Sequence, residues 1–207
     1  MFSGGNSPRG RAGMAPRACA LAGVLAAVLA GVLAAAGCSS GGGSDGGSQP
    51  SWAKSLGSSV TIVPPGASSP GNATPGGVMA GVVKSLSSGP IIDFCKYEQP
   101  AQQSSCRSTF GQVTKSEVAS QLPTFKNFAE GYTAIDGTKA LIGVTGTICV
   151  PNQKPSCYTN KDPAAILDSG KPFATLWREA VAAPANVYSL SPVIEVNGSW
   201  YAYTSSS

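Results

Sequence analysis

Cys38 carries the thiol with the clearest chemical use in this sequence. It follows the string LAAAG, and the run from Ala18 to Ala36 before it is apolar and uncharged. A basic start, an apolar run and small residues before a cysteine are typical of a bacterial lipoprotein signal, whose cysteine is acylated. We therefore expect a signal peptide over residues 1–37 and a lipid on Cys38. The basic start consists of Arg9, Arg11 and Arg17.

An uncleaved membrane helix is the alternative interpretation of the same run. Ala18 to Ala36 is close to the roughly 20 residues that span a bilayer, and Ala35 stands where such signals usually carry leucine. Both interpretations place the rest of the chain outside the cytoplasm and next to the membrane. We expect a lipid anchor at the extracytoplasmic face of the cell membrane.

Four further cysteines, Cys95, Cys106, Cys149 and Cys157, predict disulfides, because an even number of cysteines in an oxidising compartment normally pairs. Three connectivities are open, and the short spacings favour Cys95 with Cys106 and Cys149 with Cys157. Each closure would contribute about 3 kcal/mol by the chain-entropy estimate. A zinc site is disfavoured, because the chain has no histidine and no Cys-x-x-Cys spacing.

The absence of histidine also restricts the catalytic chemistry that is possible. Without histidine, the Ser-His-Asp, Cys-His and His-metal arrangements are excluded. Carboxylate chemistry beside tyrosine hydroxyls remains. The alternative is that the acids face solvent and that the aromatic side chains form core. The side chains expected to line a pocket, if one exists, are Asp93, Glu130, Tyr132, Trp177, Trp200 and Tyr201.

Charge and composition exclude further classes. Removing the three arginines of the signal from the 14 basic residues leaves 11 basic against 10 acidic side chains. A chain with so little excess positive charge is not expected to form the basic surface that nucleic-acid binding requires. No nucleic-acid partner is therefore expected. No cofactor is expected.

The domain organisation follows from composition. Residues 38–77 are rich in Gly, Ser and Pro and predict a flexible linker after the lipidated cysteine, with 60–63 as either an edge strand or loose chain. The folded domain is expected over residues 78–207. Helical spacing predicts a helix over 78–86 and a second helical segment over 91–110. If Cys95 pairs with Cys106, Pro100 must allow a bend near 98–101.

Alternating apolar residues predict strands further on. Two runs, 125–135 and 139–150, flank Asp136-Gly137, and two more, 186–196 and 199–203, flank Asn197-Gly198, which favours a type I′ hairpin. Residues 172–182 fit a short helix or an irregular strand. The fold class is therefore α+β, with N-terminal helices covering one face of a strongly bent antiparallel sheet.

Two motifs carry a resemblance to a known family. VVKSLSSGPIIDFCKYEQPAQQSSC (residues 82–106) and VIEVNGSWYAY (193–203) resemble the first helices and the closing hairpin of small lipid-anchored actinobacterial proteins of the nuclear transport factor 2-like superfamily. The resemblance implies a cone-shaped α+β fold with a pocket between helices and sheet. Members of that superfamily isomerise ketosteroids, cyclise polyketides or bind proteins, so the fold alone does not indicate one activity.

The expected function is therefore non-enzymatic. The domain would bind an envelope protein, a glycan or a small apolar ligand, or would serve as an accessory domain, at the outer face of the membrane. An isomerase or cyclase-like enzyme with a carboxylate in the cone pocket is the alternative.

Overall fold

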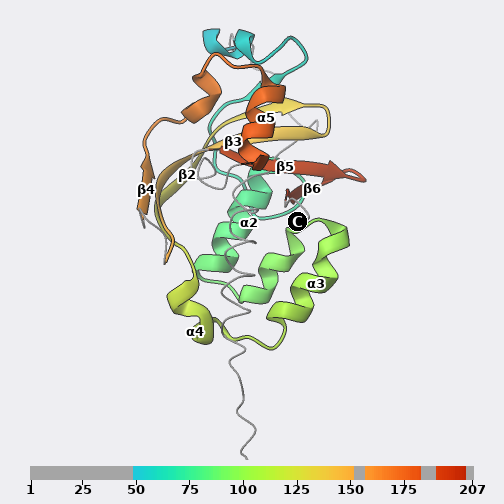
Figure 1. Ribbon diagram of the computed structural model, residues 1–207, viewed down its shortest axis with the longest axis vertical. Helices are drawn as coiled ribbons and strands as arrows, with labels where there is room; N and C mark the ends of the chain where they lie inside the picture. The colour runs from blue at the N-terminus through green and yellow to red at the C-terminus, as the bar shows by residue number, and fades with distance from the viewer. Residues whose placement is uncertain (1–48, 152–156, 183–189, 204–207) are drawn as a thin grey trace, which may run out of the picture.

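The computed structural model describes residues 49–151, 157–182 and 190–203 of the chain. These residues form an α+β fold around one curled, six-stranded antiparallel sheet, with helices on both faces (Figure 1). The strand order is β1-β2-β3-β5-β6, and β4 pairs with β3 beside this path.

The long hairpin at the centre of the sheet confirms the pattern around Asp136-Gly137. It consists of β2 (Thr124–Asp136) and β3 (Lys139–Cys149). Gly137 has a φ of 59°, a conformation that glycine adopts without strain. Two register shifts interrupt β2, between Lys126 and Ala129 and between Glu130 and Thr133. Such bulges bend a strand and increase its twist, which accounts for the curl of the sheet.

Shorter strands flank this hairpin. β1 (Thr61–Val63) pairs with residues 133–135 of β2, so the patch at 60–63 does form an edge strand. β4 (Cys157–Asn160) pairs with the end of β3. β5 (Leu190–Val196) and β6 (Ser199–Ala202) form the closing hairpin, in which Asn197 and Gly198 both have positive φ, as a type I′ turn requires. Residues 186–189 of the predicted strand lie outside the described residues.

The N-terminal helices pack on one face of the sheet, as expected. They are α2 (Pro75–Ser87), the 3₁₀ helix η2 (Ile91–Lys96) and α3 (Pro100–Phe110). Val78 and Val82 of α2 share a buried cluster with Ile142 of β3 and Trp200 of β6. α4 (Lys115–Val118) and the 3₁₀ helix η3 (Ala119–Gln121) then lead into β2.

A second layer covers the opposite face and corrects the expectation that helices cover one face only. It contains the 3₁₀ helices η1 (Ser51–Ser55) and η4 (Ala165–Asp168) and the helix α5 (Phe173–Ala182), which resolves the ambiguity of 172–182. Figure 1 shows α5 on one side of the sheet and α2 and α3 on the other. Leu176 and Phe173 of α5 are buried with Leu141 of β3 and Leu190 of β5. The sheet therefore has two apolar faces.

Described and buried residues precede the predicted boundary at residue 78. Ala53, Leu56 and Val60 are 3%, 3% and 6% exposed, and the latter two belong to the second buried cluster. These apolar residues anchor a segment whose polar, Pro-rich composition is otherwise typical of a linker. The folded region therefore includes η1, β1 and the start of α2, and of the predicted linker only residues 38–48 lie outside the described residues.

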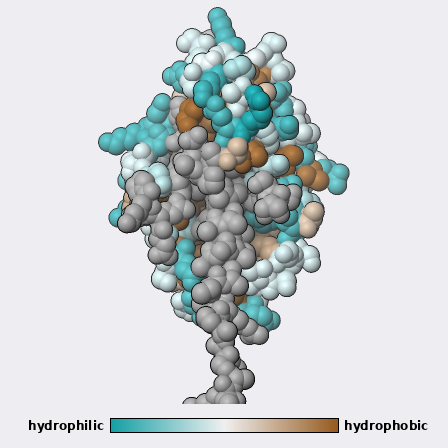
Figure 2. Space-filling view, viewed as in Figure 1, coloured by the Kyte–Doolittle hydropathy of each residue, from teal (hydrophilic) through white to brown (hydrophobic). Residues whose placement is uncertain are grey.

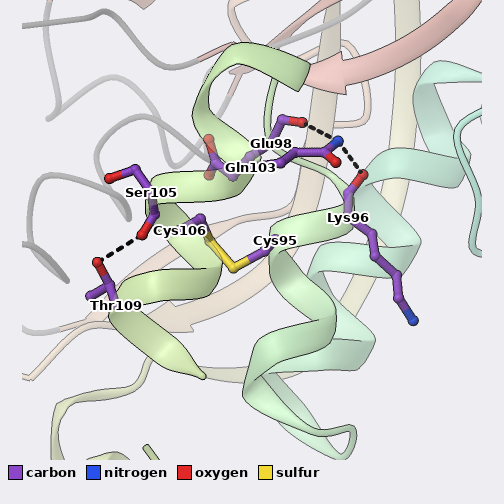
Figure 3. Close-up of a disulfide and its surroundings, with 7 residues drawn as sticks. All are labelled: Cys95, Lys96, Glu98, Gln103, Ser105, Cys106 and Thr109. Atoms are coloured by element: carbon purple, nitrogen blue, oxygen red, sulfur yellow. Dashed lines mark hydrogen bonds between the residues drawn. A yellow bond between two sulfur atoms is a disulfide. The ribbon is translucent and has the colours of Figure 1, made fainter. Parts of the chain in front are cut away.

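Both predicted disulfides are confirmed. Cys95 of η2 bonds to Cys106 of α3, with Cα atoms 5.6 Å apart, and Cys149 bonds to Cys157 across the β3–β4 pair. The chain turns between η2 and α3, where Pro100 takes the first position of α3. Gln103 braces the turn by donating to the carbonyl oxygens of Lys96 and Glu98 (Figure 3). The bend expected at 98–101 is therefore present.

Candidate functional site

The six side chains named as candidate pocket residues are divided between the two faces and the surface. Glu130 and Trp200 lie on the face covered by α2. Tyr132 and Trp177 belong to the cluster on the opposite face, where Tyr132 contacts Trp52 and Trp177 stacks on Phe173. The sheet therefore separates them, and the six do not line one cavity.

The two remaining candidates are near the surface. Asp93 forms an exposed ion pair with Lys96, with Nζ and Oδ1 2.6 Å apart. Tyr201 is half-buried on β6, where it pairs with Ile194. Trp200, in contrast, is fully buried and belongs to the core.

Glu130 of β2 is a half-buried carboxyl group on the face covered by α2. Burial among protein atoms raises the pKa of Glu130, and a hydrogen bond from the Ser68 hydroxyl, 2.7 Å from Oε2, partly opposes this effect. The carboxylate sits against the first turn of α2, in the space that a side chain at Gly76 would fill. Glycine at this position therefore permits the close approach between β2 and α2.

The segment before α2 holds this region together, and its role was not anticipated from the sequence. Asn72 donates from Nδ2 to the carbonyl oxygens of Trp200, 2.6 Å away, and Lys96, and its own carbonyl accepts from the Trp200 backbone nitrogen. Thr74 is the N-cap of α2 and accepts from the backbone nitrogen of Gly77. The pair Thr74-Pro75 is a typical helix start and could have revealed this boundary.

A half-open groove of ≈ 300 Å³ lies at the other end of α2. Its walls come from the end of α2, from α4 and η3, and from the start of β2. Three of its apolar residues are buried and Phe125 is half-buried. Ser87, Ala119 and Thr124, at its edge, are exposed. The residues that line the groove are Leu86, Ser87, Lys115, Ala119, Leu122, Pro123, Thr124 and Phe125.

Lys115 is the single charged residue among those lining the groove. Its Nζ donates to the carbonyl oxygens of Ser85 and Gly89, 3.3 and 3.2 Å away, at the end of α2. A cation is favourable at the C-terminus of a helix, where carbonyl groups lack partners within the helix. Burial lowers the pKa of Lys115. Sequence reasoning missed this site, because the groove is formed by three segments separated along the chain.

Apolar groups on the surface are scattered rather than gathered. On the face in Figure 2, the brown residues outside the grey region form small separate spots among hydrophilic ones. Val63, 43% exposed, is the large apolar side chain that stands out as exposed in the described part of the chain. A small groove is thus a better candidate for binding than a broad apolar surface.

Over residues 49–151, 157–182 and 190–203, no helix is long and apolar enough to cross a membrane, and no three candidate ligand side chains gather as a metal site would require. Cys38 and the predicted signal peptide lie outside these ranges.

Comparison with known proteins gave no match to a family model, a curated protein or a solved structure.

Proposed function

We propose that the protein is an extracytoplasmic lipoprotein, acylated at Cys38, whose disulfide-braced domain binds a ligand without turning it over. The observation that carries this proposal is the pair of disulfides in a chain with a lipoprotein-type start. Disulfides persist in oxidising compartments and are rare in the cytosol. The domain would belong to the nuclear transport factor 2-like superfamily, a proposal supported by its curled antiparallel sheet with helices packed against it.

The non-enzymatic part of the proposal is supported by where the ionisable groups lie. Asp93 is occupied in a surface ion pair, and the tyrosine nearest to Glu130 in the sequence, Tyr132, faces the other side of the sheet. The partner is then the membrane through the lipid, together with an envelope protein, a glycan or a small apolar ligand.

Metabolic labelling tests the anchor. The full chain is produced in a bacterium grown with alkyne-tagged palmitate, as wild type, as Cys38→Ala and as Cys19→Ala. Wild type and Cys19→Ala should carry the label and partition into detergent, because Cys19 is predicted to leave with the signal peptide. Cys38→Ala should carry no label. Equal labelling of Cys38→Ala, or no labelling of the wild type, would refute the proposal.

A second candidate function is favoured by one observation, the raised pKa of the half-buried Glu130. A carboxyl group of this kind is suited to general acid or base catalysis, as in an isomerase or cyclase. The test uses a β,γ-unsaturated ketosteroid and follows the absorbance of the conjugated product. The non-enzymatic proposal predicts no rate above buffer. A rate that Glu130→Gln abolishes and Asp93→Asn retains would establish the enzyme instead.

A further inference from the structure

The groove at the end of α2 combines apolar walls with one ammonium group. Leu86, Leu122 and Pro123 are buried, and Phe125 adds a half-buried ring. Apolar surface in a concave site favours a hydrocarbon chain, and a volume of ≈ 300 Å³ lies at the small end of the range for ligand pockets. The walls therefore suit a short or medium chain rather than a large ring system.

The positive charge of Lys115 in the groove favours a ligand whose polar end is negatively charged. A lysine ammonium has three N–H groups. In the described part of the chain, Lys115 directs its hydrogen bonds to the carbonyl oxygens of Ser85 and Gly89. One donor is left for a ligand, and a hydrogen bond between two ionised groups is stronger than one between neutral groups.

Neighbouring charges favour a single negative charge. The carbonyl oxygen of Ser85 belongs to the negative end of the α2 dipole, and that of Gly89 lies just beyond the helix. Both offset part of the lysine charge. Glu117, the closest acid in sequence, does not line the groove, and its carboxylate accepts hydrogen bonds from the backbone nitrogen and hydroxyl of Thr114. One carboxylate fits this balance better than a doubly charged phosphate, which would need further cations.

We propose that the groove between α2, α4 and β2 binds a short- or medium-chain fatty carboxylate, with its carboxylate on Lys115 and its chain against Leu86, Leu122 and Phe125. This assignment rests on the proposed binding role and gives it a ligand class.

The binding experiment uses the full acylated protein in lipid nanodiscs, with empty nanodiscs as the blank. Calorimetry follows three probes: octanoate, octanol, which has the chain without the charge, and acetate, which has the charge without the chain. Octanoate should bind more tightly than either control. Octanol binding as tightly as octanoate would overturn the role of Lys115, and octyl phosphate binding more tightly would overturn the carboxylate assignment.

Two pairs of variants locate the site. Lys115→Gln should weaken octanoate binding about tenfold, the effect of losing one charge-assisted contact, and leave octanol binding unchanged. Lys84→Gln, an exposed lysine on α2, is its control. Ala119→Trp should block the groove to both probes, whereas Ser120→Trp, an exposed neighbour that does not line the groove, should not. Both alanine and serine are exposed, so these tryptophans leave the core intact.

The possible failures are distinguishable. If palmitate labels Cys38 but octanoate does not bind, the ligand class is wrong and the anchor stands. If octanoate binds and Ala119→Trp leaves the affinity unchanged, the ligand occupies another site and the groove assignment is overturned.

Discussion

Trp200 shows how one residue connects the sheet to the helices. Its ring is fully buried with Val78 and Val82 of α2, and its backbone forms two hydrogen bonds with Asn72. Its indole nitrogen is buried without a hydrogen-bond partner among the described residues, as is the hydroxyl of Ser191. Such groups reduce stability, so the packing of the ring must outweigh this cost.

Replacing Trp200 with alanine should therefore lower the free energy of unfolding by about 3 to 5 kcal/mol, because a large buried ring leaves a cavity. Urea unfolding of the full chain measures the change. Trp52→Ala is the control, because Trp52 is only partly buried against Tyr132. Its replacement should lower the free energy of unfolding by less. A change below about 1 kcal/mol for Trp200→Ala would contradict its place in the core.

Glu130 makes a prediction about pH. Burial raises its pKa in the folded state, so the folded protein binds this proton more tightly than the unfolded chain does. The stability from this group is present at low pH and is lost as pH rises through the folded pKa. Relative to Glu130→Gln, which does not titrate, the wild type should become less stable between about pH 4 and pH 7.

Unfolding midpoints in urea at the two pH values measure this difference. Glu179→Gln removes a glutamate from a surface ion pair with Lys171 and is the control for a general effect of replacing a glutamate. A wild type that gains stability over Glu130→Gln as pH rises would show that hydrogen bonding from Ser68 outweighs the effect of burial.

Individual residues differ in how far sequence could place them. The cysteine pairs were predictable because short spacing and the expected oxidising compartment leave few good alternatives. The surroundings of Glu130 were not, because Ser68 and Gly76 come from a segment whose composition predicts a linker. The site at Lys115 was missed for a similar reason. Its partners, Ser85 and Gly89, lie near the end of α2, about 26 to 30 residues earlier in the chain.

At the scale of elements, the chain before α2 is part of the fold. Leu56 and Val60 are buried under the second layer, and β1 extends the sheet beside β2. Partly buried Trp52 and Ile62 pack against the same cluster, although Gly, Ser and Pro dominate this segment. Periodicity predicted the helices and hairpins well, because their apolar faces are long enough to repeat.

Deleting residues 49–63 from the full chain should therefore lower its stability by about 3 kcal/mol or more, since fully burying a leucine or valine contributes roughly 1.5 to 3 kcal/mol. Thermal unfolding measures the effect. Deleting 39–48, the Gly/Ser tract, is the control and should leave the melting temperature unchanged. An equally small effect of both deletions would mean that η1 and β1 do not stabilise the sheet.

The two disulfides differ in accessibility. Cys95 and Cys106 are buried, at 0% and 9% exposure, whereas Cys157 is exposed and Cys149 half-buried. Thiol exchange requires access to sulfur. A mild reductant should therefore open Cys149–Cys157 first, as alkylation followed by mass spectrometry would reveal. Earlier alkylation of Cys95 and Cys106 would contradict the burial of that pair.

At the scale of the whole molecule, the sheet lies between two apolar layers. α2, η2 and α3 cover one face and η1, η4 and α5 the other, so each strand of the central hairpin is buried on both sides over part of its length. The sequence predicted the α+β class and the first layer. It did not predict the second, because α5 has ten residues and its apolar spacing also fits an irregular strand.

The central claim is that export and acylation at Cys38 bring this domain to the outer face of the membrane. The intact mass of the protein extracted from bacterial membranes tests it most directly. We expect the mass of a chain that begins at Cys38 and carries a diacylglyceryl group. The four other cysteines should lack their thiol hydrogens, because they form two disulfides. A mass that retains residues 1–37, or an unmodified Cys38, would contradict the account.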